Sequence, residues 1–540
     1  MFDEWCRSGL RDLVVCPGSR STPLALAGAR RDELQVHVRI DERSAGFFAL
    51  GRALVTKLPV AVVVTSGTAA AELHAAVAEA DLSNVPLLIV TADRPPELHG
   101  VGAPQTIKQH DLYGSMVRRF EEPGVSRSEA APSWRPLASR LWLDAAGVDS
   151  PSGPVHLNAA FVEPLLAEPL DLPPPRGGDH PWRTWSGRSP GAVVLDVEGQ
   201  RVLAVVGAGV NEVTLAHCEA LDWAVLGDAT ARGSLAYFDA LLRDERFVAQ
   251  ARPDVVIRMG GLPASRVLHD QLRLWGVRTV SIGGTDRAAD PQGLVAEIVD
   301  GLPHREQSSL RGDPAYAHYW RSASRRVGEW LDHLEANDAE LTEPMVARIV
   351  SMAGTRHRVP LMIGSSMPVR DVEWWSRSRE SEVYANRGAN GIDGVVSTVL
   401  GIAAGGRALG LVGDVTLLHD VSGLVDGLGS AGGSCVLVVA NNHGGGIFSF
   451  LSQATKLATV RFEELFATPR PHDLEAVARA FGHASVSVKS GRDLEAAIDH
   501  GLAATGLTVV VAHVPPRDEN VQRHEMLNRA ARDHWSTDQP

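Results

Sequence analysis

The stretch VVANNHGGGIFSF, residues 438 to 450, decides the fold. It begins with apolar residues typical of a buried strand, and two asparagines and three glycines follow almost directly. Upstream, the apolar run LGLVG is followed by Asp414, and Asn442 lies 28 residues further along the chain. A strand, a crossover helix and the next parallel strand span about 30 residues. The spacing therefore predicts that Asp414 and Asn442 lie side by side at the carboxyl ends of adjacent strands, where open α/β sheets bind ligands.

These residues have the chemistry of a metal and phosphate site. The carboxylate of Asp414, the amide oxygen of Asn442 and the carbonyl of Gly444 are hard oxygen donors, which suit Mg²⁺ with phosphate oxygens and water completing its shell. Because Gly413 and residues 444–446 are glycines without side chains, their backbone N–H groups can approach a phosphate closely. A helix cap and an Asn-Gly turn are the plain alternatives. The joint spacing favours a metal–diphosphate site.

Alternating strands and helices fill most of the chain. The segments LRDLVVCPGSRSTPLALAGAR (10–30) and LPVAVVVTSGTAAAELHAAVAEADLSNVPLLIV (58–90) each run from a strand through a small-residue turn into a helix, as parallel βαβ units do. Two further α/β blocks follow, and the first and last blocks are similar in size and style. We therefore predict an α/β fold of three doubly wound parallel-sheet domains. The expected boundaries are a first domain at 1–166, a Pro-rich linker at 167–190, a central domain at 191–303, a connecting helix at 304–342 and a third domain at 343–540.

Composition and charge narrow the class of protein. Of the 540 residues, 44% are hydrophobic and 22% charged, so sizeable cores can form. The net charge of −13 argues against a general nucleic-acid binder, which needs a basic face. Four scattered cysteines without a CxxC pair favour a reducing compartment. Because the sequence also lacks a signal-peptide pattern and an apolar run of roughly 20 residues, we expect a cytoplasmic protein without a membrane partner.

The Gly-Asp pair followed at this distance by Asn-Asn resembles the signature of thiamine-diphosphate enzymes. Six ordered motifs narrow the resemblance to the 2-succinyl-5-enolpyruvyl-6-hydroxy-3-cyclohexene-1-carboxylate synthases of menaquinone biosynthesis (the MenD family). They are CPGSRSTPLALA (16–27), IDERSAGFFALG (40–51), TSGTAAAEL (65–73), TADRPPEL (91–98), NRGANGIDG (386–394) and GDVTLLHD (413–420). The resemblance implies a pyrimidine-binding, a central and a diphosphate-binding domain, in that order.

The resemblance also implies the cofactors, thiamine diphosphate and Mg²⁺ (or Mn²⁺). It makes Glu42 the catalytic glutamate, which hydrogen-bonds N1′ of the aminopyrimidine and favours the tautomer whose N4′ acts as a base. A surface glutamate in an Asp-Glu-Arg cluster is the plain alternative. The implied metal ligands are Asp414, Asn442 and Gly444. The implied cofactor-binding residues are Glu42, Ser366, Gly413, Asp414, Val415, Asn442, Gly444, Gly445 and Ile447.

The implied substrates, 2-oxoglutarate and isochorismate, bring four carboxylates, of which three remain after CO₂ leaves. Arginine suits these carboxylates because its planar guanidinium group binds a carboxylate through two parallel hydrogen bonds. The implied substrate-binding residues are Ser19, Arg20, Arg94, Gln105, Arg266, Ser366, Arg370, Arg387, Phe448 and Leu451. Surface ion pairing for the arginines and core packing for Phe448 and Leu451 are the alternatives. These two residues and Ile447 follow the glycines, where we expect a helix to begin.

Two other functions stay open at this point: an acetolactate-synthase-like enzyme or 2-keto-acid decarboxylase of the same superfamily, and a non-catalytic protein that kept the fold. Glu72 and Pro104 stand where the family usually has Asn, and Ser265 where it often has a basic residue. Glu42 lies in the first domain and Asp414 in the third. The resemblance therefore implies a homodimer with shared sites, and a pairing of two dimers into a tetramer.

Overall fold

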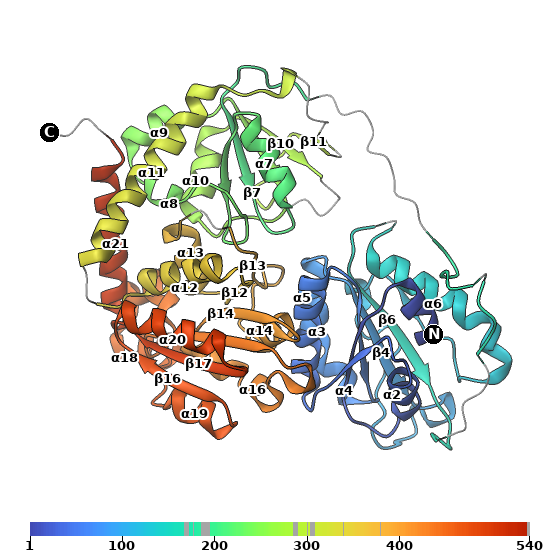
Figure 1. The fold of residues 1–540 in the computed structure, drawn as a ribbon. Coiled ribbons are helices and arrows are strands. Elements are labelled where there is room, and N and C mark those ends of the chain that lie inside the picture. The colour runs from blue at the N-terminus through green and yellow to red at the C-terminus, as the bar shows by residue number, and fades with distance from the viewer. Residues whose placement is uncertain are drawn as a thin grey trace.

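The computed structural model describes residues 1–148, 150–166, 172–176, 178–184, 195–283, 290–299, 301–302, 308–337, 340–377 and 380–536 (Figure 1). Three sheets of parallel strands lie in three α/β domains, as the sequence predicts. The third domain (orange to red) lies against both the first (blue to cyan) and the second (green to yellow). Much of the predicted Pro-rich linker lies outside the described residues. Within the described ranges, none of the helices combines the length and apolar character that crossing a bilayer requires.

The first sheet has the strand order β2-β1-β3-β4-β6-β5. Its strands are β1 (Asp12–Val15), β2 (Gln35–Val38), β3 (Val60–Val64), β4 (Leu87–Asp93), β5 (Phe120–Glu121) and β6 (Pro154–Ala160). Its helices are α1 (Phe2–Ser8), α2 (Thr22–Ala29), α3 (Glu42–Thr56), α4 (Thr68–Glu72), α5 (His74–Leu82) and α6 (Ala131–Ala146). The central strands are buried along their whole length, which explains their near-continuous apolar sequence.

The third sheet repeats this topology, with the order β13-β12-β14-β15-β17-β16. Its strands are β12 (Leu361–Ile363), β13 (Val383–Tyr384), β14 (Arg407–Gly413), β15 (Ser434–Asn441), β16 (Ala484–Val488) and β17 (Gly506–His513). Its helices are α12 (Glu343–His357), α13 (Met367–Trp375), α14 (Val395–Ala403), α15 (Asp414–His419), α16 (Gly423–Asp426), α17 (Ser452–Lys456), α18 (Thr459–Phe462), α19 (Leu474–Ala480), α20 (Gly491–Ala503) and α21 (Arg517–His534). The similarity of the first and last blocks in the sequence therefore reflects one shared architecture.

The second sheet has the order β11-β10-β9-β7-β8. Its strands are β7 (Val202–Val206), β8 (Ala224–Gly227), β9 (Val255–Met259), β10 (Arg278–Ile282) and β11 (Glu297–Val299). The helices are α7 (Glu212–Ala220), α8 (Phe238–Leu241), α9 (Glu245–Ala251), α10 (Arg266–Trp275) and the long connecting helix α11 (Pro314–Asn337). The C-terminal helix α21 runs beside α11, and its Leu527 and Ala531 join the core of the second domain (Figure 1).

The first and third domains meet through α3 and α14, which follow the second strand of their respective sheets. The two helices approach so closely that a Cβ on Gly51 would lie 2.2 Å from the carbonyl oxygen of Thr398. In the same way, a Cβ on Gly401 would lie 2.1 Å from the carbonyl oxygen of Phe48. Equivalent helices thus cross at equivalent glycines, and one hydrophobic core continues from the first sheet into the third.

Candidate functional site

A cavity of about 1060 Å³ lies at the carboxyl ends of β12, β14 and β15. β14 and β15 are neighbours, with Gly413 paired to Ala440, so Asp414 and Asn442 do follow adjacent strands. The cavity brings together all of the predicted residues of the third domain. Those that line it are Ser366, Arg370, Arg387, Gly413, Asp414, Val415, Asn442, Gly444, Gly445, Ile447, Phe448 and Leu451.

Asp414 is the first residue of α15 and is buried. Its Oδ1 accepts a hydrogen bond from the N–H of Val415 at 2.9 Å, and its Oδ2 accepts one from the N–H of Gly444 at 2.7 Å. Burial raises the pKa of Asp414 to about 6, although both backbone hydrogen bonds oppose the shift. A cation beside this carboxylate would favour its charged form.

Asn442 presents an unsatisfied acceptor in the same place. Its Nδ2 donates to Oε1 of Glu343 at 2.7 Å. Its Oδ1 is buried and has no hydrogen-bond partner among the described residues. A buried acceptor left unpaired costs about 1–3 kcal/mol, and a cation would satisfy it. Together with the carboxylate of Asp414, this donor set fits Mg²⁺.

The glycines that follow Asn442 are required by close backbone contacts. Gly444 has a φ of 138°, and a Cβ there would lie 2.3 Å from the carbonyl oxygen of Ala467. A Cβ on Gly446 would lie 2.3 Å from Nδ2 of Asn442. A Cβ on Gly413, by contrast, would meet no atom within 4 Å. The backbone at Gly413 is therefore open to the cavity, which suits a diphosphate group.

The segment after the glycines differs from the expected helix. Residues Gly446–Phe450 form a 3₁₀ turn, in which the N–H of Phe448 bonds to the carbonyl of Gly445. The α-helix α17 starts only at Ser452, after an extended Leu451. The backbone is diverted because the N–H of Gly445 bonds to the carbonyl of Ala467 at 2.7 Å. The expectation that Ile447 and Phe448 begin an α-helix is therefore corrected.

Two arginines form a cationic part of the cavity wall. Arg370 donates through Nη1 to the carbonyl of Ser366 at 2.6 Å, and burial, followed by the charge of Arg387, lowers its pKa. Arg387 contacts the carbonyl of Leu262 at 3.4 Å, and its Nε has no hydrogen-bond partner in the described part of the chain. Ser366 adopts a φ of 77°, a strained conformation of the kind that clusters at functional sites. This wall suits an anionic ligand.

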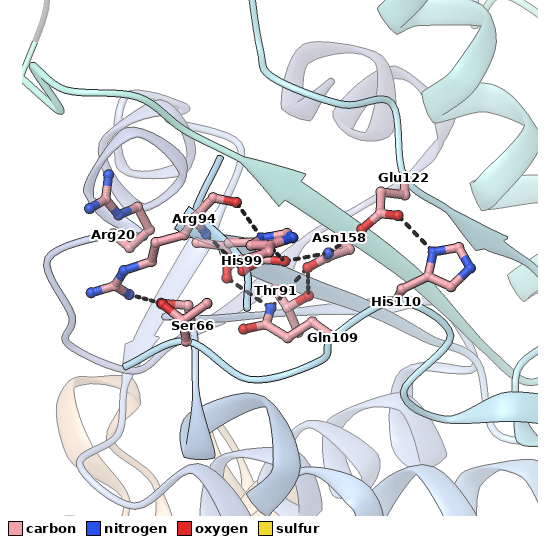
Figure 2. Close-up of polar contacts among 12 residues, drawn as sticks. Arg20, Ser66, Thr91, Arg94, His99, Gln109, His110, Glu122 and Asn158 are labelled. Carbon is pink, nitrogen blue, oxygen red and sulfur yellow. Dashed lines mark hydrogen bonds and ion pairs between the residues drawn. The ribbon is translucent and has the colours of Figure 1, made fainter. Parts of the chain in front are cut away.

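A second group of predicted residues lies at the carboxyl edge of the first sheet and does not line the cavity. Arg94 donates to Oγ of Ser66 and to the carbonyl of Gln105 at 3.1 Å. Arg20 donates to the carbonyl of Phe161 at 3.1 Å. Burial, followed by the charge of Arg20, lowers the pKa of Arg94. Figure 2 shows the two guanidinium groups on the same side of this edge, and Ser19 adjoins Arg20 in the same loop.

A buried polar network adjoins Arg94 at the edge of the first sheet (Figure 2). Asp93 accepts from the backbone N–H of Arg94 at 2.7 Å and from Nδ2 of Asn158 at 2.9 Å. Gln109 donates to Oδ1 of Asn158 at 2.9 Å. We did not predict this network from the sequence. Its signal was the pair His156 and Asn158, two polar residues within the otherwise apolar strand PVHLNAA.

Glu42 is the first residue of α3 and is half-buried. Burial, followed by the charges of Asp41 and Glu72, raises its pKa. Among the described residues, no hydrogen bond or ion pair to another side chain holds its carboxylate. It does not line the cavity. Arg266 also lies outside the cavity, on the exposed start of α10, within 3.5 Å of Asp270.

Comparison with known proteins identifies the family. Residues 2–112 match the model for the thiamine pyrophosphate enzyme N-terminal TPP binding domain, and residues 372–512 match its C-terminal counterpart. A 2-succinyl-5-enolpyruvyl-6-hydroxy-3-cyclohexene-1-carboxylate synthase from Thermobifida fusca is 40% identical over 92% of each chain. A synthase of the same name from Bacillus velezensis is 34% identical over 98% of this chain and 96% of its own. The chain belongs to this synthase family.

The solved structures extend the comparison to the fold. A thiamine diphosphate-dependent 4-hydroxybenzoylformate decarboxylase from Rhodococcus jostii superposes with a TM-score of 0.68. The match covers 96% of this chain and 98% of that one, at 16% sequence identity. The likeness concerns the fold alone. The synthase family member described here thus has the three-domain arrangement of thiamine-diphosphate enzymes.

Glu343 is a further residue of this synthase site that we did not predict from the sequence. It is buried at the start of α12, lines the cavity and contacts the amide of Asn442. Oε1 of Glu343 accepts from Nδ2 of Asn442, and this leaves Oδ1 of Asn442 for a cation. Burial, followed by the charge of Asp371, raises the pKa of Glu343, and a cation on the neighbouring oxygen donors would favour its charged form. No local pattern around Glu343 indicates this role, because the two residues are 99 positions apart.

We expect Glu343→Gln to weaken Mg²⁺ binding by about 10- to 100-fold, the usual effect of losing a residue that orients a metal ligand. The glutamine amide can donate as well as accept, so it no longer fixes the orientation of Asn442. Calorimetric titration of Mg²⁺ in the presence of thiamine diphosphate measures the change. Glu373→Gln is the matched control, because Glu373 is equally buried but accepts from the backbone of Ala264. Equal Mg²⁺ affinity in wild type and Glu343→Gln would contradict this role.

Proposed function

We propose that the protein decarboxylates 2-oxoglutarate and adds the resulting four-carbon unit to isochorismate. The products are 2-succinyl-5-enolpyruvyl-6-hydroxy-3-cyclohexene-1-carboxylate and CO₂, in menaquinone biosynthesis. The main support is the likeness, along nearly the whole chain, to relatives that bear this synthase name at 34–40% identity. The cavity with its buried oxygen donors and its two arginines agrees with this chemistry.

When bound, thiamine diphosphate supplies the nucleophilic carbon and the electron sink that decarboxylation requires. Asp414, Asn442 and the carbonyl of Gly444 would hold Mg²⁺ or Mn²⁺ on the diphosphate. The backbone of Gly413, Val415 and Gly445 would approach the phosphate oxygens, and Ile447 and Ser366 would contact the cofactor. Glu42 would hold the proton at N1′ of the pyrimidine.

The arginines would bind the carboxylates of the two substrates. Arg370 and Arg387 line the cavity, while Arg20 and Arg94 lie at the edge of the first sheet, with Ser19, Gln105 and Ser366 as neutral donors beside them. Phe448 and Leu451 line the cavity and would contact apolar parts of the substrates. Arg266 stays a prediction, because it is 89% exposed in the single chain.

The test of this function is release of CO₂ that depends on both substrates. An acetolactate-synthase-like enzyme or 2-keto-acid decarboxylase would instead release CO₂ from one keto acid alone, such as pyruvate. We expect turnover with 2-oxoglutarate plus isochorismate and a product of the corresponding mass. Turnover with pyruvate alone, and none with the pair, would replace the proposal with the alternative.

We further propose a homodimer, with two dimers pairing into a tetramer. The pyrimidine-binding domain (1–166) of one chain would face the diphosphate-binding domain (343–540) of the other. The support is that Glu42 lies in the first domain, away from the cavity that contains Asp414 and Asn442. One cofactor needs all three residues, and an isologous pair would create two equivalent sites.

Mixed dimers test this arrangement. We expect inactive Glu42→Gln chains and inactive Asp414→Ala chains to regain activity when they exchange subunits. In a mixed dimer, one site contains both substitutions and the other site contains neither. Up to about half of the activity of a wild-type dimer should therefore return. Native mass spectrometry verifies the exchange. Verified exchange with no regained activity would exclude a shared site.

A further inference from the structure

Arg387 lies in a loop at the cavity, and the contacts of its side chain are weak. It shares the cavity wall with Arg370, and its charge contributes to the lowered pKa of that arginine, so the two cations repel each other. Among the described residues, its guanidinium has one long hydrogen bond, 3.4 Å to the carbonyl of Leu262. Within the loop, Asn390 donates to the carbonyl of Arg387 at 3.2 Å. Asn390 also donates to the carbonyl of Gly388 at 3.4 Å, and shorter contacts to the loop come from the first domain.

The two residues after Arg387 are bound by a carboxylate of the first domain. The N–H of Gly388 donates to Oε1 of Glu79 at 2.9 Å, and the N–H of Ala389 donates to Oε2 at 2.7 Å. Ser83 donates its hydroxyl to Oε1 at 2.6 Å. Glu79 lies on α5, is only 2% exposed and is 309 positions away from Gly388. Both carboxylate oxygens thus bind consecutive N–H groups of the loop.

Steric fit reinforces this contact. A Cβ on Gly388 would lie 2.7 Å from Cβ of Leu82 and 2.9 Å from the backbone nitrogen of Ser83. The loop therefore lies directly on the C-terminal end of α5. Asp81, Leu82 and Asn84, from the same end of α5 and just beyond it, line the cavity themselves. The first domain of the chain thus lines part of the cavity and also binds the loop that carries Arg387.

We propose that Glu79 is a positioning residue for substrate binding, which holds Arg387 in place to bind a substrate carboxylate. The inference rests on the proposed function, because that function makes Arg387 a substrate ligand. Glu79 itself does not touch the reacting groups. It acts through the backbone of Gly388 and Ala389, and it couples the geometry of the substrate pocket to the contact between the first and third domains.

Glu79→Gln tests the proposal in the enzyme loaded with thiamine diphosphate and Mg²⁺. The amide oxygen can accept one N–H, but the NH₂ group faces the other N–H and leaves it unpaired. We expect KM for at least one of the two substrates to rise by about 10- to 100-fold, the scale of a displaced binding group. We expect kcat and thiamine-diphosphate affinity to stay within about threefold of wild type, since the metal-binding groups are untouched.

Ser83→Ala is the matched control. It removes the third hydrogen bond to Glu79 but leaves both backbone contacts, so its KM values should equal those of wild type. Gly388→Ala disturbs the same contact, because the added Cβ would collide with Leu82 and Ser83. This variant should raise KM even if Glu79→Gln does not fold. Unchanged KM values in both variants would overturn the proposal. A parallel loss of thiamine-diphosphate affinity and kcat would also overturn it, because the role would then be structural.

Amide hydrogen exchange separates this inference from the proposed function. We expect the amides of Gly388 and Ala389 to exchange faster in Glu79→Gln than in wild type, whether or not substrate is present. If wild type does not turn over the two substrates, the proposed function fails, and the exchange rates still decide whether Glu79 holds the loop. Equal exchange rates in the two proteins would overturn the positioning role.

Discussion

Asp414→Ala should abolish the activity that depends on thiamine diphosphate. The variant removes the one carboxylate among the proposed Mg²⁺ ligands and also frees the N–H of Gly444, which bonds to it at 2.7 Å. A bound cation supplies several kcal/mol of charge stabilisation, and each 1.4 kcal/mol is a factor of ten. We therefore expect activity to fall by at least about 100-fold at saturating thiamine diphosphate. Steady-state assays and calorimetric titration with Mg²⁺ measure the two effects.

The chain offers a matched control for this variant. Asp420 follows the same helix, α15, and burial raises its pKa to about 6, as for Asp414. It accepts from the N–H of Ser397 at 2.8 Å and does not line the cavity. Asp420→Ala should therefore reduce thermal stability but keep the Mg²⁺ affinity. Retained activity in Asp414→Ala, with unchanged Mg²⁺ dependence, would refute the metal assignment.

Glu42→Gln should leave thiamine-diphosphate binding measurable but slow the exchange of the C2 proton of the bound cofactor. The glutamine amide cannot take the same part in proton transfer at N1′, and loss of such a group typically costs about 10²- to 10⁴-fold. Deuterium exchange at C2, followed by rapid quench and NMR, measures the rate directly. A wild-type exchange rate in Glu42→Gln would show that another group plays this role.

Glu72→Gln controls for charge at the same place. Glu72 ends α4, is exposed, and contributes to the raised pKa of Glu42 through its negative charge. Burial and the charge of Asp41, which also raise the pKa of Glu42, remain in this variant. The pKa of Glu42 therefore falls only by the contribution of Glu72. C2 exchange should therefore change by no more than a few-fold. A comparable loss in both variants would point to local charge rather than to the carboxylate of Glu42.

The sequence predicts the parts of the site that depend on strand order. Asp414 and Asn442 each follow an apolar run, and a spacing of one βαβ unit is sufficient to place them on adjacent strands, as β14 and β15 are. The three-domain layout follows from the same periodicity. The sequence predicts an α-helix at Ile447 and Phe448, which the structure does not have. Hydrophobic periodicity contains no information on the hydrogen bond between Gly445 and Ala467 that diverts the backbone.

The sequence does not predict the roles of Glu343 and Glu79, for a different reason. Glu343 and Glu79 each lie on a helix whose sequence is ordinary, and their partners are 99 and 309 positions away. Hydrophobic periodicity tells which face of a helix is buried, but not which distant polar group the face meets. A fully buried glutamate is rare unless it is paired, so such residues become informative only once burial is known.

The crossing of α3 and α14 has a consequence for how the chain is made. Gly51 and the carbonyl of Thr398 that covers it are separated by 347 residues (398 − 51). At typical rates of ribosomal synthesis, this interval lasts on the order of 20 to 70 seconds. Throughout it, the side of α3 with Phe47 and Gly51 emerges from the ribosome without α14 and its N-cap Gly394, which later cover it. We therefore expect chaperones to bind the exposed side of α3 in the nascent first domain. Without them, this side of α3 can pair with the same surface of a neighbouring chain on one polysome.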